Sequence, residues 1–455
     1  MRSRNLFRFF VFGTALVLLR PAAWSQCPTP VFGQDKKITS FTGNPQGDPD
    51  LIVDPYYRPM GLGTVYAVWH EFFDHVKMWD IQFSSSTSGG ATWSPARTLN
   101  SNPSGSQLHP AIGVDQFCSA NGTIWVVWVD FDAPVTGDRR IMVTTSSDRG
   151  VTWSPEVPVH PQALPPSDQD HPRVSVKDNT AFIAWQEQTP AASNNLDILF
   201  TCLSLPITPA PIVITVNNTP PQRLLFAVDV DAAWSSSVST VDRVHVAWDE
   251  RALNPNNILF NSSSAPCAAW GSETPVPQNG GSLPRLWPAL ESFGTRVWMT
   301  YEDRNWFQGQ AFAIIHQQLP TIGLPWTPEI KVDPTHTSGS FDQIGSDITM
   351  TFPFLGDPAL CGTVLGDETP KLYAGWLEDR AQPFSGTRNF AVTCSSNNGT
   401  SWSNPPNTQI NDVVNKVMPL RASLAGDIFS DVVYAAWGDT RDPSGVPQIW
   451  VDVGQ

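Results

Sequence analysis

Residues 123–130 read TIWVVWVD, and this segment decides the fold because six other segments of the chain repeat its pattern. Each copy carries a large aromatic residue, here called the anchor, with an acid two positions later. The anchors are spaced 53 to 75 residues apart, and they are Trp69, Trp128, Trp185, Trp248, Tyr301, Trp376 and Trp437. Seven similar units of this length predict a repeat architecture.

A second ring lies three positions before each anchor. These residues are Tyr66, Trp125, Phe182, His245, Trp298, Tyr373 and Tyr434. On a β-strand, an odd offset places two side chains on opposite faces. Both faces of this strand are therefore bulky, which indicates a sheet packed between two neighbouring sheets.

Further strand-like runs flank each copy, such as residues 109–115 before TIWVVWVD and residues 140–146 after it. A fourth run closes most units. The last unit supplies only three strands, whereas residues 36–41 (KKITSF) form a spare strand near the start. This arrangement predicts an all-β fold, a seven-bladed β-propeller of four-stranded antiparallel blades in which the N-terminal strand completes the last blade. We expect residues 26–455 to form one domain.

The composition agrees with many short strands joined by turns, because the chain has 42 prolines, 31 glycines and 19 tryptophans. Its formal net charge is −15, and removal of the four arginines in residues 1–25 would make it more negative. Nucleic acid is therefore not an expected partner, since phosphate binding depends on clustered Lys and Arg. We expect a monomer whose partner is a glycan or an extracellular protein.

Residues 1–25 combine early arginines, a short apolar run and small residues near the end, which is typical of a secretory signal peptide. We expect a secreted, periplasmic or cell-surface protein without a membrane span. A lipid anchor on Cys27 is an alternative, but Gln26 does not suit a lipobox.

Export permits disulfides among the six cysteines, and their spacing selects no pairing. Cys118 and Cys361 lie in loops of one face and could form a surface disulfide. Cys202 and Cys394 occupy matching strands of units too far apart in a ring to bond each other.

A turn motif, SSDRGVTW, occupies residues 146–153 between the third and fourth strands of the second unit. Residues 85–93 and 395–402 are close variants, and weaker forms end at Trp270 and Trp326. Short polar residues, a glycine and a tryptophan suit a tight turn. The motif resembles the Asp-box of the bacterial neuraminidase repeat, which sialidases share with other propeller families. This resemblance implies a propeller with the boxes on the face opposite the ligand site.

The active-site residues of sialidases do not transfer to this chain. The family uses three arginines, a tyrosine nucleophile with a glutamate partner and an aspartic acid, on six blades. The nearest approach to its first arginine motif is Tyr57-Arg58-Pro59, which lacks the aliphatic residue before proline. Four of the six tyrosines fill repeat positions. The resemblance therefore covers the architecture and the turn motif.

The acid two positions after each anchor lies where the loops of the ligand face begin. These acids are Glu71, Asp130, Glu187, Glu250, Asp303, Glu378 and Asp439. Their sevenfold equivalence favours a structural role, such as capping loop amides. The alternative is that one or two serve catalysis or cation binding, and Asp303, Glu378 and Glu250 are the candidates.

Four consecutive units add an arginine close to this acid: Arg251, Arg304, Arg380 and Arg441. Together they could hold a carboxylate or sulfate of a ligand. A local ion pair with the adjacent acid is the alternative.

Histidines form a third constellation. His70, His75, His109 and His171 lie near strand ends of the same face and, with Asp74 or Asp170, could bind a metal. Isolated loop histidines are the alternative. We expect no cofactor otherwise, and a structural Ca²⁺ is left open.

These observations support three hypotheses. The first is an exported, non-catalytic propeller that binds a glycan or a protein. The second is an exo-glycosidase of sialidase-like type with a carboxylate pair in its central funnel. The third is a structural or adhesion module without a small ligand.

Overall fold

The described part of the computed structural model consists of short strands and the turns between them. It covers residue 27 and residues 30–38, 43–74, 78–102, 105–115, 122–131, 139–160, 168–188, 196–207, 213–217, 225–234, 241–251, 257–263, 267, 270–277, 283–304, 311–337, 341–352, 369–380, 388–403, 408–414, 416–418 and 421–455. Within these ranges, no helix has the length and apolarity needed to cross a membrane.

The strands form seven four-stranded antiparallel sheets, which are called blades 1 to 7 in chain order. Blade 1 consists of β2 (Gln46–Asp54), β3 (Thr64–Asp74), β4 (Met78–Ser86) and β5 (Arg97–Thr98). Blade 2 consists of β6 (Ser106–Val114), β7 (Ile124–Phe131), β8 (Arg139–Ser146) and β9 (Val157–Pro158). Blade 3 consists of β10 (Asp168–Lys177), β11 (Thr180–Gln188), β12 (Leu196–Ser204) and β13 (Val213–Thr215).

Blades 4 to 7 continue the same order. Blade 4 consists of β14 (Leu225–Trp234), β15 (Val241–Glu250), β16 (Asn257–Ser262) and β17 (Thr274–Pro275). Blade 5 consists of β18 (Arg285–Phe293), β19 (Arg296–Asp303), β20 (Ala313–Leu319) and β21 (Ile330–Lys331). Blade 6 consists of β22 (Gln343–Thr351), β23 (Lys371–Glu378), β24 (Asn389–Ser395) and β25 (Thr408–Gln409). Blade 7 consists of β26 (Ser423–Asp427), β27 (Val432–Asp439), β28 (Gln448–Gly454) and β1 (Lys36–Lys37).

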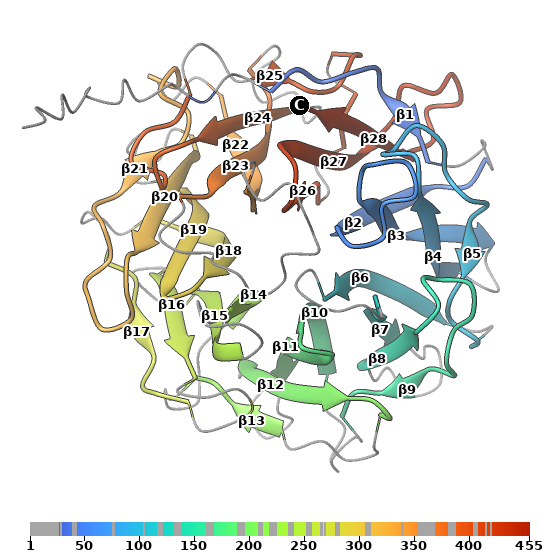
Figure 1. Ribbon diagram of the computed structural model, residues 1–455, viewed down its shortest axis with the longest axis horizontal. Coiled ribbons are helices and arrows are strands. Elements are labelled where there is room, and N and C mark those ends of the chain that lie inside the picture. The colour runs from blue at the N-terminus through green and yellow to red at the C-terminus, as the bar shows by residue number, and fades with distance from the viewer. Residues whose placement is uncertain are drawn as a thin grey trace, which may run out of the picture.

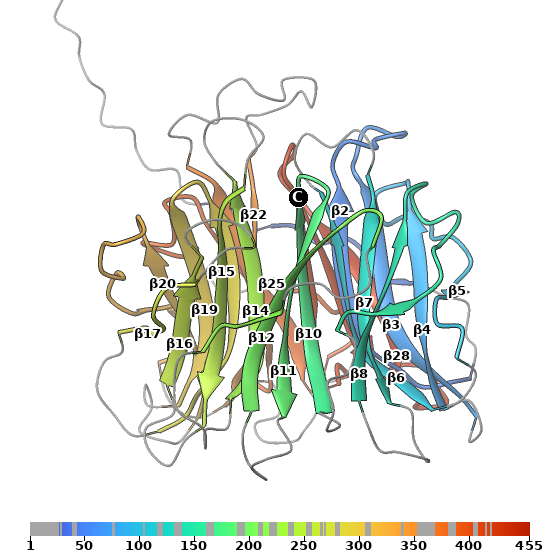
Figure 2. The same cartoon turned by 90° about the horizontal axis from the view of Figure 1, so that it is seen from below.

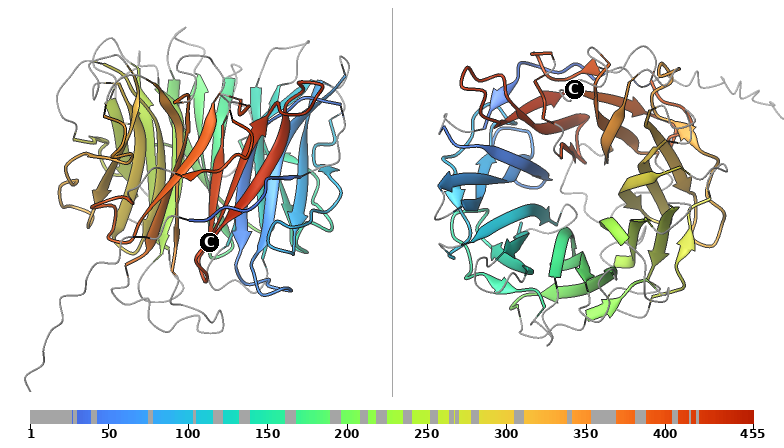
Figure 3. Two further views of the ribbon diagram at one scale, coloured as in Figure 1. Left: turned by 90° about the horizontal axis from the view of Figure 1, so that it is seen from above. Right: turned by 180° about the vertical axis from the view of Figure 1, so that it is seen from behind.

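The blades stand in a ring with their first strands innermost (Figure 1). Seen from the side, the strands run roughly along the axis of the ring (Figure 2 and the left view of Figure 3). The predicted seven-bladed propeller is confirmed.

Neighbouring blades interlock through the two rings of each second strand. Trp69 packs with residues of blade 7, including Tyr434, whereas Tyr66 packs with residues of blade 2, including Trp128. All seven anchors are fully buried. The predicted burial of both faces is therefore confirmed, and each blade depends on both of its neighbours for its core.

The N-terminal strand closes the ring, as the sequence predicts. Lys36 and Lys37 pair antiparallel with Val451 and Trp450 of β28, and the Ile38 N–H donates to the carbonyl of Ile449 at 3.2 Å. The remainder of the predicted strand, residues 39–41, lies outside the described residues. Because the pairing covers the outer edge of β28, the last blade has a partner along that edge.

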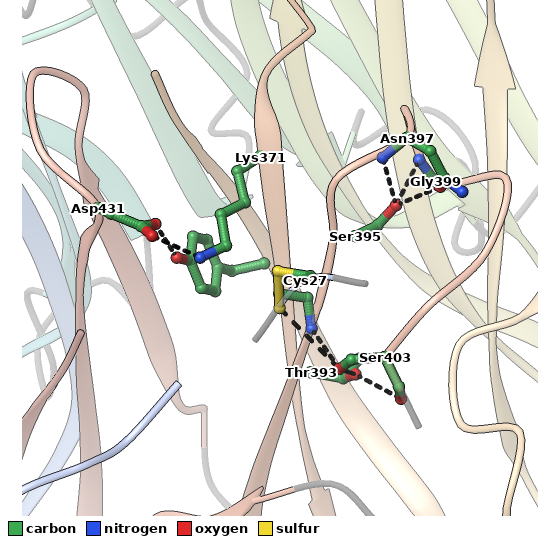
Figure 4. The surroundings of a disulfide bond; sticks show 10 residues. Cys27, Lys371, Thr393, Ser395, Asn397, Gly399, Ser403 and Asp431 are labelled. Atoms are coloured by element: carbon green, nitrogen blue, oxygen red, sulfur yellow. Dashed lines mark hydrogen bonds and ion pairs between the residues drawn. A yellow bond between two sulfur atoms is a disulfide. The ribbon is translucent and has the colours of Figure 1, made fainter. Parts of the chain in front are cut away.

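Within the part of the chain that the structure describes, two disulfides join segments that are far apart in sequence. Cys27 is bonded to Cys394 in β24 of blade 6, next to Thr393 and Ser403 (Figure 4). This bond ties the N-terminal segment to the ring, and it contradicts the alternative of a lipid on Cys27. Cys202 is bonded to Cys267, so Cys202 and Cys394 do not pair with each other, as predicted. Two disulfides fit a protein that folds in an oxidising compartment.

Several predictions concern residues that the structure leaves undescribed. The signal peptide at residues 1–25 and the cysteines Cys118 and Cys361 lie outside the described residues.

Carboxylates on the innermost strands connect one blade to the next. In three blades an aspartate accepts the backbone N–H of the following first strand: Asp50 from Ile112 at 3.0 Å, Asp229 from Leu290 at 2.7 Å and Asp347 from Leu424 at 2.8 Å. Each of these bonds joins the first strand of one blade to the first strand of the next. These three aspartates therefore help to fix the spacing of the inner strands.

The turns that resemble the Asp-box share one hydrogen-bond pattern. In the turn of residues 146–153, the N–H of Gly150 donates to Ser146 Oγ at 2.7 Å, and the N–H of Thr152 donates to Asp148 Oδ1 at 2.7 Å. Equivalent bonds occur at Gly90 and Thr92 and at Gly399 and Ser401. The glycine has a positive φ in all three turns, which is a conformation that glycine adopts without strain.

The tryptophan that ends each motif packs on the preceding blade. Trp153 meets Phe83 edge to face, with ring centroids 4.9 Å apart. The same contact joins Trp270 to Phe200, Trp326 to Phe260 and Trp402 to His316. These turns therefore contribute to the packing between blades.

A glycine substitution tests this packing. An added Cβ at Gly150 would lie 2.5 Å from Phe83, and the φ of Gly150 is +87°. We expect Gly150→Ala to destabilise the fold by about 2–4 kcal/mol, from positive-φ strain and overpacking together. Gly445→Ala is the control, since φ is +71° there and no atom lies within 4 Å. It should cost only about 1–2 kcal/mol. Equal losses in urea unfolding would contradict the packing role.

Candidate functional site

A cavity of about 340 Å³ lies where the innermost strands begin. First and third strands of a blade run in the same direction, and the Asp-box-like turns follow third strands, so the cavity lies at the opposite end from these turns. This is the end at which the sequence predicts the ligand face. The cavity is lined by Asp48, His109, Pro110, His171, Arg173, Asp229, Trp287, Pro288, Ala289, Glu302, Ile344, Gly345, Ser346, Asp347, Leu377, Arg421 and Ala422.

A β-bulge at the same point of six innermost strands shapes this cavity. In β6, for example, Leu108 pairs with Val129, but Ala111 pairs with Val127, so the inner strand has one extra residue. Blades 1, 3, 4, 5 and 6 show the same shift. One residue of each bulge has a positive φ: Asp48, His109, His171, Ala227, Trp287 and Gly345. Such bulges change the direction of a side chain.

Proline follows the positive-φ residue in four of these bulges, at Pro49, Pro110, Pro172 and Pro288. Proline cannot donate to a ladder, so within sheets it is found at bulges and edges. A proline inside an otherwise strand-like run therefore predicts a bulge, and the residue before the proline is the one with positive φ. Five of the six positive-φ residues line the cavity.

Asp48 and two histidines form one side of the site. His109 Nδ1 lies 3.0 Å from Asp48 Oδ2, and His70 Nδ1 lies 3.7 Å from the same oxygen. Burial would raise the pKa of Asp48, but the hydrogen bond with His109 and the charges of His70 and His109 hold that pKa below its ordinary range. Burial lowers the pKa of His70 to about 4.

Asp170 lies beside this group. The ring of His171 stacks on that of His109 with centroids 4.5 Å apart, and His171 Nδ1 lies 3.2 Å from Asp170 Oδ1. Burial opposes ionisation of Asp170, but the hydrogen bond and charge of His171, with the charges of His109 and Arg139, lower its pKa below the ordinary range.

Other carboxyl groups of the cavity have the opposite shift. Burial raises the pKa of Asp229 to about 7 and that of Glu302 to about 8, even though the N–H of Gly345 donates to Glu302 Oε1 at 2.7 Å. Burial also raises the pKa of Asp347. The cavity thus holds carboxyl groups in dissimilar environments, which is the condition for one to act as an acid and another as a base.

Two arginines lie among these carboxyl groups. Arg421 lies 3.2 Å from Asp50 Oδ1. Although burial disfavours its charge, Asp50 and Asp347 raise the pKa of Arg421. Burial lowers the pKa of Arg173 to about 10, so this guanidinium stays charged at neutral pH.

The acids that follow the anchors make contacts within their own blades. Gln46, Gln107, Gln169 and Gln343 each donate a side-chain N–H to the acid of their own blade at 2.8 to 3.3 Å. The indole N–H of Trp185, Trp376 and Trp437 donates to the acid two positions later. These contacts agree with the structural alternative for this set.

The three catalytic candidates do not appear among the cavity-lining residues. Asp303 is buried and lies 3.1 Å from Arg285 Nε. Glu378 is buried and contacts Gln343, Trp376 and Arg380. Glu250 is buried at the end of β15, opposite Leu225. Glu302, the neighbour of Asp303, does line the cavity.

The four predicted ligand-binding arginines each lie over an aromatic ring: Arg251 over Trp287, Arg304 over Phe312, Arg380 over Phe341 and Arg441 over Trp450. Three of them pair with carboxylates. Arg251 binds Asp249 at 3.0 Å, Arg380 binds Glu378 at 3.1 Å and also Asp333, and Arg441 binds Asp439 and Asp35. These contacts agree with the local ion pairs considered above.

Three of the four histidines of the predicted metal site lie close together. His70, His109 and His171 lie around Asp48 and Asp170, as described above. His75 and the side chain of Asp74 lie outside the described residues.

The sequence reasoning missed Trp287, Arg173, Arg421, Asp229 and Glu302, all of which line the cavity. Trp287 is 37% exposed. A proline follows Trp287, His109 and His171. These prolines could have identified the bulges, and with them three residues that line the cavity.

No protein-family model and no curated protein sequence matches the chain. A crystal structure of a protein of unknown function from Dyadobacter fermentans has 11% identity and a TM-score of 0.51, covering 94% of this chain and 100% of that one. A mutant α-L-arabinofuranosidase from Fusarium graminearum, in complex with an iminosugar inhibitor, has 11% identity and a TM-score of 0.50, covering 93% and 97%.

A Hadza microbial sialidase has 14% identity and a TM-score of 0.49, with 90% of this chain and 66% of that chain covered. At these identities the similarity concerns the fold alone. The propeller architecture that the resemblance implies is confirmed by the seven four-stranded blades of the structure, and no activity follows from it.

The raised pKa of Glu302 predicts a pH-dependent effect of Glu302→Gln. Between pH 5 and pH 8 the folded protein keeps a proton that the unfolded chain loses near the ordinary pKa of 4.5. Raising the pH through this window therefore removes stability from the wild type but not from the variant. The free energy of unfolding of the variant minus that of the wild type should rise by on the order of 2–3 kcal/mol from pH 5 to pH 8. Thermal unfolding at both pH values measures this difference. A difference independent of pH would contradict the assigned shift.

Proposed function

We propose that this protein is an exported, glycan-binding propeller that holds a sugar residue in the axial cavity. The observation that carries the proposal is the position of Trp287, a 37% exposed indole on a cavity wall that also carries charged and hydrogen-bonding groups. A sugar presents an apolar C–H face and a rim of hydroxyls. An aromatic face beside several polar side chains is complementary to both.

The fold neighbours support a carbohydrate ligand by analogy. One of them, the Fusarium graminearum arabinofuranosidase, was solved with an iminosugar inhibitor. Fold analogy alone does not assign a ligand, but it agrees with the chemistry of the cavity. The two disulfides agree with export.

Hydrolysis of a glycosidic bond is the second candidate, since the cavity combines a carboxyl group of lowered pKa, Asp48, with one of raised pKa, Glu302. A glycosidase needs an acid that is protonated at the working pH and a second carboxylate that is ionised. Glu302 has the first property and Asp48 has the second.

Substitution of Trp287 tests the binding proposal. A glycan array would identify a ligand, and its dissociation constant would be measured by calorimetry for wild type, Trp287→Phe and Trp287→Ala. We expect Trp287→Ala to weaken binding about tenfold or more, because the stacking surface is lost, and Trp287→Phe to retain most of it. Leu324→Ala is the control, because this 56% exposed residue lies in the turn after β20, at the opposite end of the ring.

An array without ligands would favour the protein-binding or adhesion alternatives and overturn the proposal. Equal affinities of Trp287→Ala and wild type would place the sugar elsewhere.

A screen against fluorogenic sialosides and a panel of aryl glycosides separates binding from hydrolysis. If the protein is a glycosidase, we expect Glu302→Gln to lose at least about a hundredfold in kcat while the ligand still binds. Turnover that is unchanged in Glu302→Gln would contradict the role of Glu302. The absence of turnover with every substrate of the panel would leave binding as the function.

A further inference from the structure

We propose that His109, His171 and Asp170 form a binding site for a divalent transition-metal ion on the wall of the axial cavity. The site takes its ligands from β6 and β10, the innermost strands of blades 2 and 3. One ligand atom from each of the three residues lies within 4.8 Å of the others. This proposal does not depend on which sugar, if any, the cavity binds.

The separations between these atoms suit one shared metal ion. His171 Nδ1 lies 3.2 Å from Asp170 Oδ1, and His109 Nε2 lies 4.0 Å from the same oxygen. In a tetrahedral zinc site with bonds of about 2.0–2.2 Å, neighbouring ligand atoms are about 3.3–3.6 Å apart. Small side-chain movements would therefore bring all three atoms to bonding distance. The two imidazole rings, stacked at 4.5 Å, must turn so that their lone pairs converge.

The surroundings of His109 favour the tautomer that suits a metal. Its Nδ1 lies 3.0 Å from Asp48 Oδ2, so an N–H at Nδ1 donates to this carboxylate and leaves the lone pair of Nε2 directed toward Asp170. Histidine ligands in metal sites usually donate their other N–H to a carboxylate in this way. Asp48 thus orients the ligand without itself binding the metal.

The two carboxylate oxygens of Asp170 have different partners. Arg139 binds its Oδ2, whereas Oδ1 is the oxygen that both histidines face. The ion pair with Arg139 therefore orients the carboxylate and leaves Oδ1 on the side of the histidines. Oδ1 also accepts the backbone N–H of His171 at 2.8 Å, which fixes the carboxylate further.

His171 faces the same oxygen. Its Nδ1 is buried and lies 3.2 Å from Asp170 Oδ1, a contact that is favourable when a proton lies between the two atoms. Metal ions bind the deprotonated forms of histidine and aspartate and displace such protons. A metal ion between Nδ1 and Asp170 Oδ1 would therefore take the place of this proton.

The donor set selects the class of metal. Two imidazoles and one carboxylate suit Zn²⁺ and its neighbours in the first transition series, whereas Ca²⁺ takes oxygen ligands. Three protein ligands beside an open cavity also leave a fourth position for water or a sugar hydroxyl. The structural Ca²⁺ left open by the sequence is therefore not the ion that these residues would hold.

Metal binding is tested on the full, untagged chain after treatment with a chelator. Zn²⁺ is titrated by calorimetry at pH 7.5, and bound Co²⁺ is observed through its visible absorption, which is intense in tetrahedral sites. We expect one Zn²⁺ per chain and a Co²⁺ spectrum of tetrahedral type. His109→Asn and His171→Asn should each weaken binding by at least about a hundredfold, and Asp48→Asn by about 10–100-fold.

Asparagine is chosen because both histidines have positive φ, 51° and 50°, a conformation that Asn tolerates. Thermal unfolding without metal confirms that each variant is folded. His160→Ala, outside the cluster, is the matched control and should bind as the wild type does. Failure of the wild type to bind Zn²⁺ at micromolar concentration would overturn the proposal. So would Zn²⁺ binding by His109→Asn and His171→Asn that is as tight as that of the wild type. Neither result would affect the sugar-binding tests at Trp287.

Discussion

The interlocking of aromatic side chains between blades is the interaction on which the rest of the structure depends. The anchor of one blade packs against the second ring of the preceding blade, as Trp69 does with Tyr434 and Trp128 with Tyr66. No blade can bury its middle strand alone, so the chain must form a closed ring. Blade 7 becomes complete only when β1 returns to β28. The axial cavity exists because this ring closes.

Positions that carry the same type of residue in every blade belong to the scaffold, whereas positions that differ between blades form the candidate site. The acids after the anchors recur in all seven units and contact residues of their own blades, as Glu378 contacts Gln343. The bulge positions differ from blade to blade, with histidine in blades 2 and 3 and tryptophan in blade 5. A repeat scaffold needs equivalent residues, whereas a ligand needs an asymmetric set of contacts. The proposed functions therefore rest on the irregular positions.

Much of the fold could be predicted from the sequence because its signals are local and repeated. The spacing of Trp125 and Trp128, the turn at residues 146–153 and the spare strand at 36–41 each stand within one short segment. The cavity could not be predicted in the same way, because Trp287 and Glu302 are far from His109 in sequence and meet only across the ring. A bulge changes the direction of its side chain through one extra residue, which periodicity does not reveal. Proline beside His109 and His171 was the available signal.

Hydrogen–deuterium exchange along β28 tests the closure of the ring most directly. In an antiparallel strand, alternate amides point to the two neighbouring strands. If β1 and the preceding residues cover the outer edge, both sets of amides in residues 448–455 should exchange as slowly as those of β27. Slow exchange of only the set facing β27, with fast exchange of the other set, would show an open edge and contradict the closed ring.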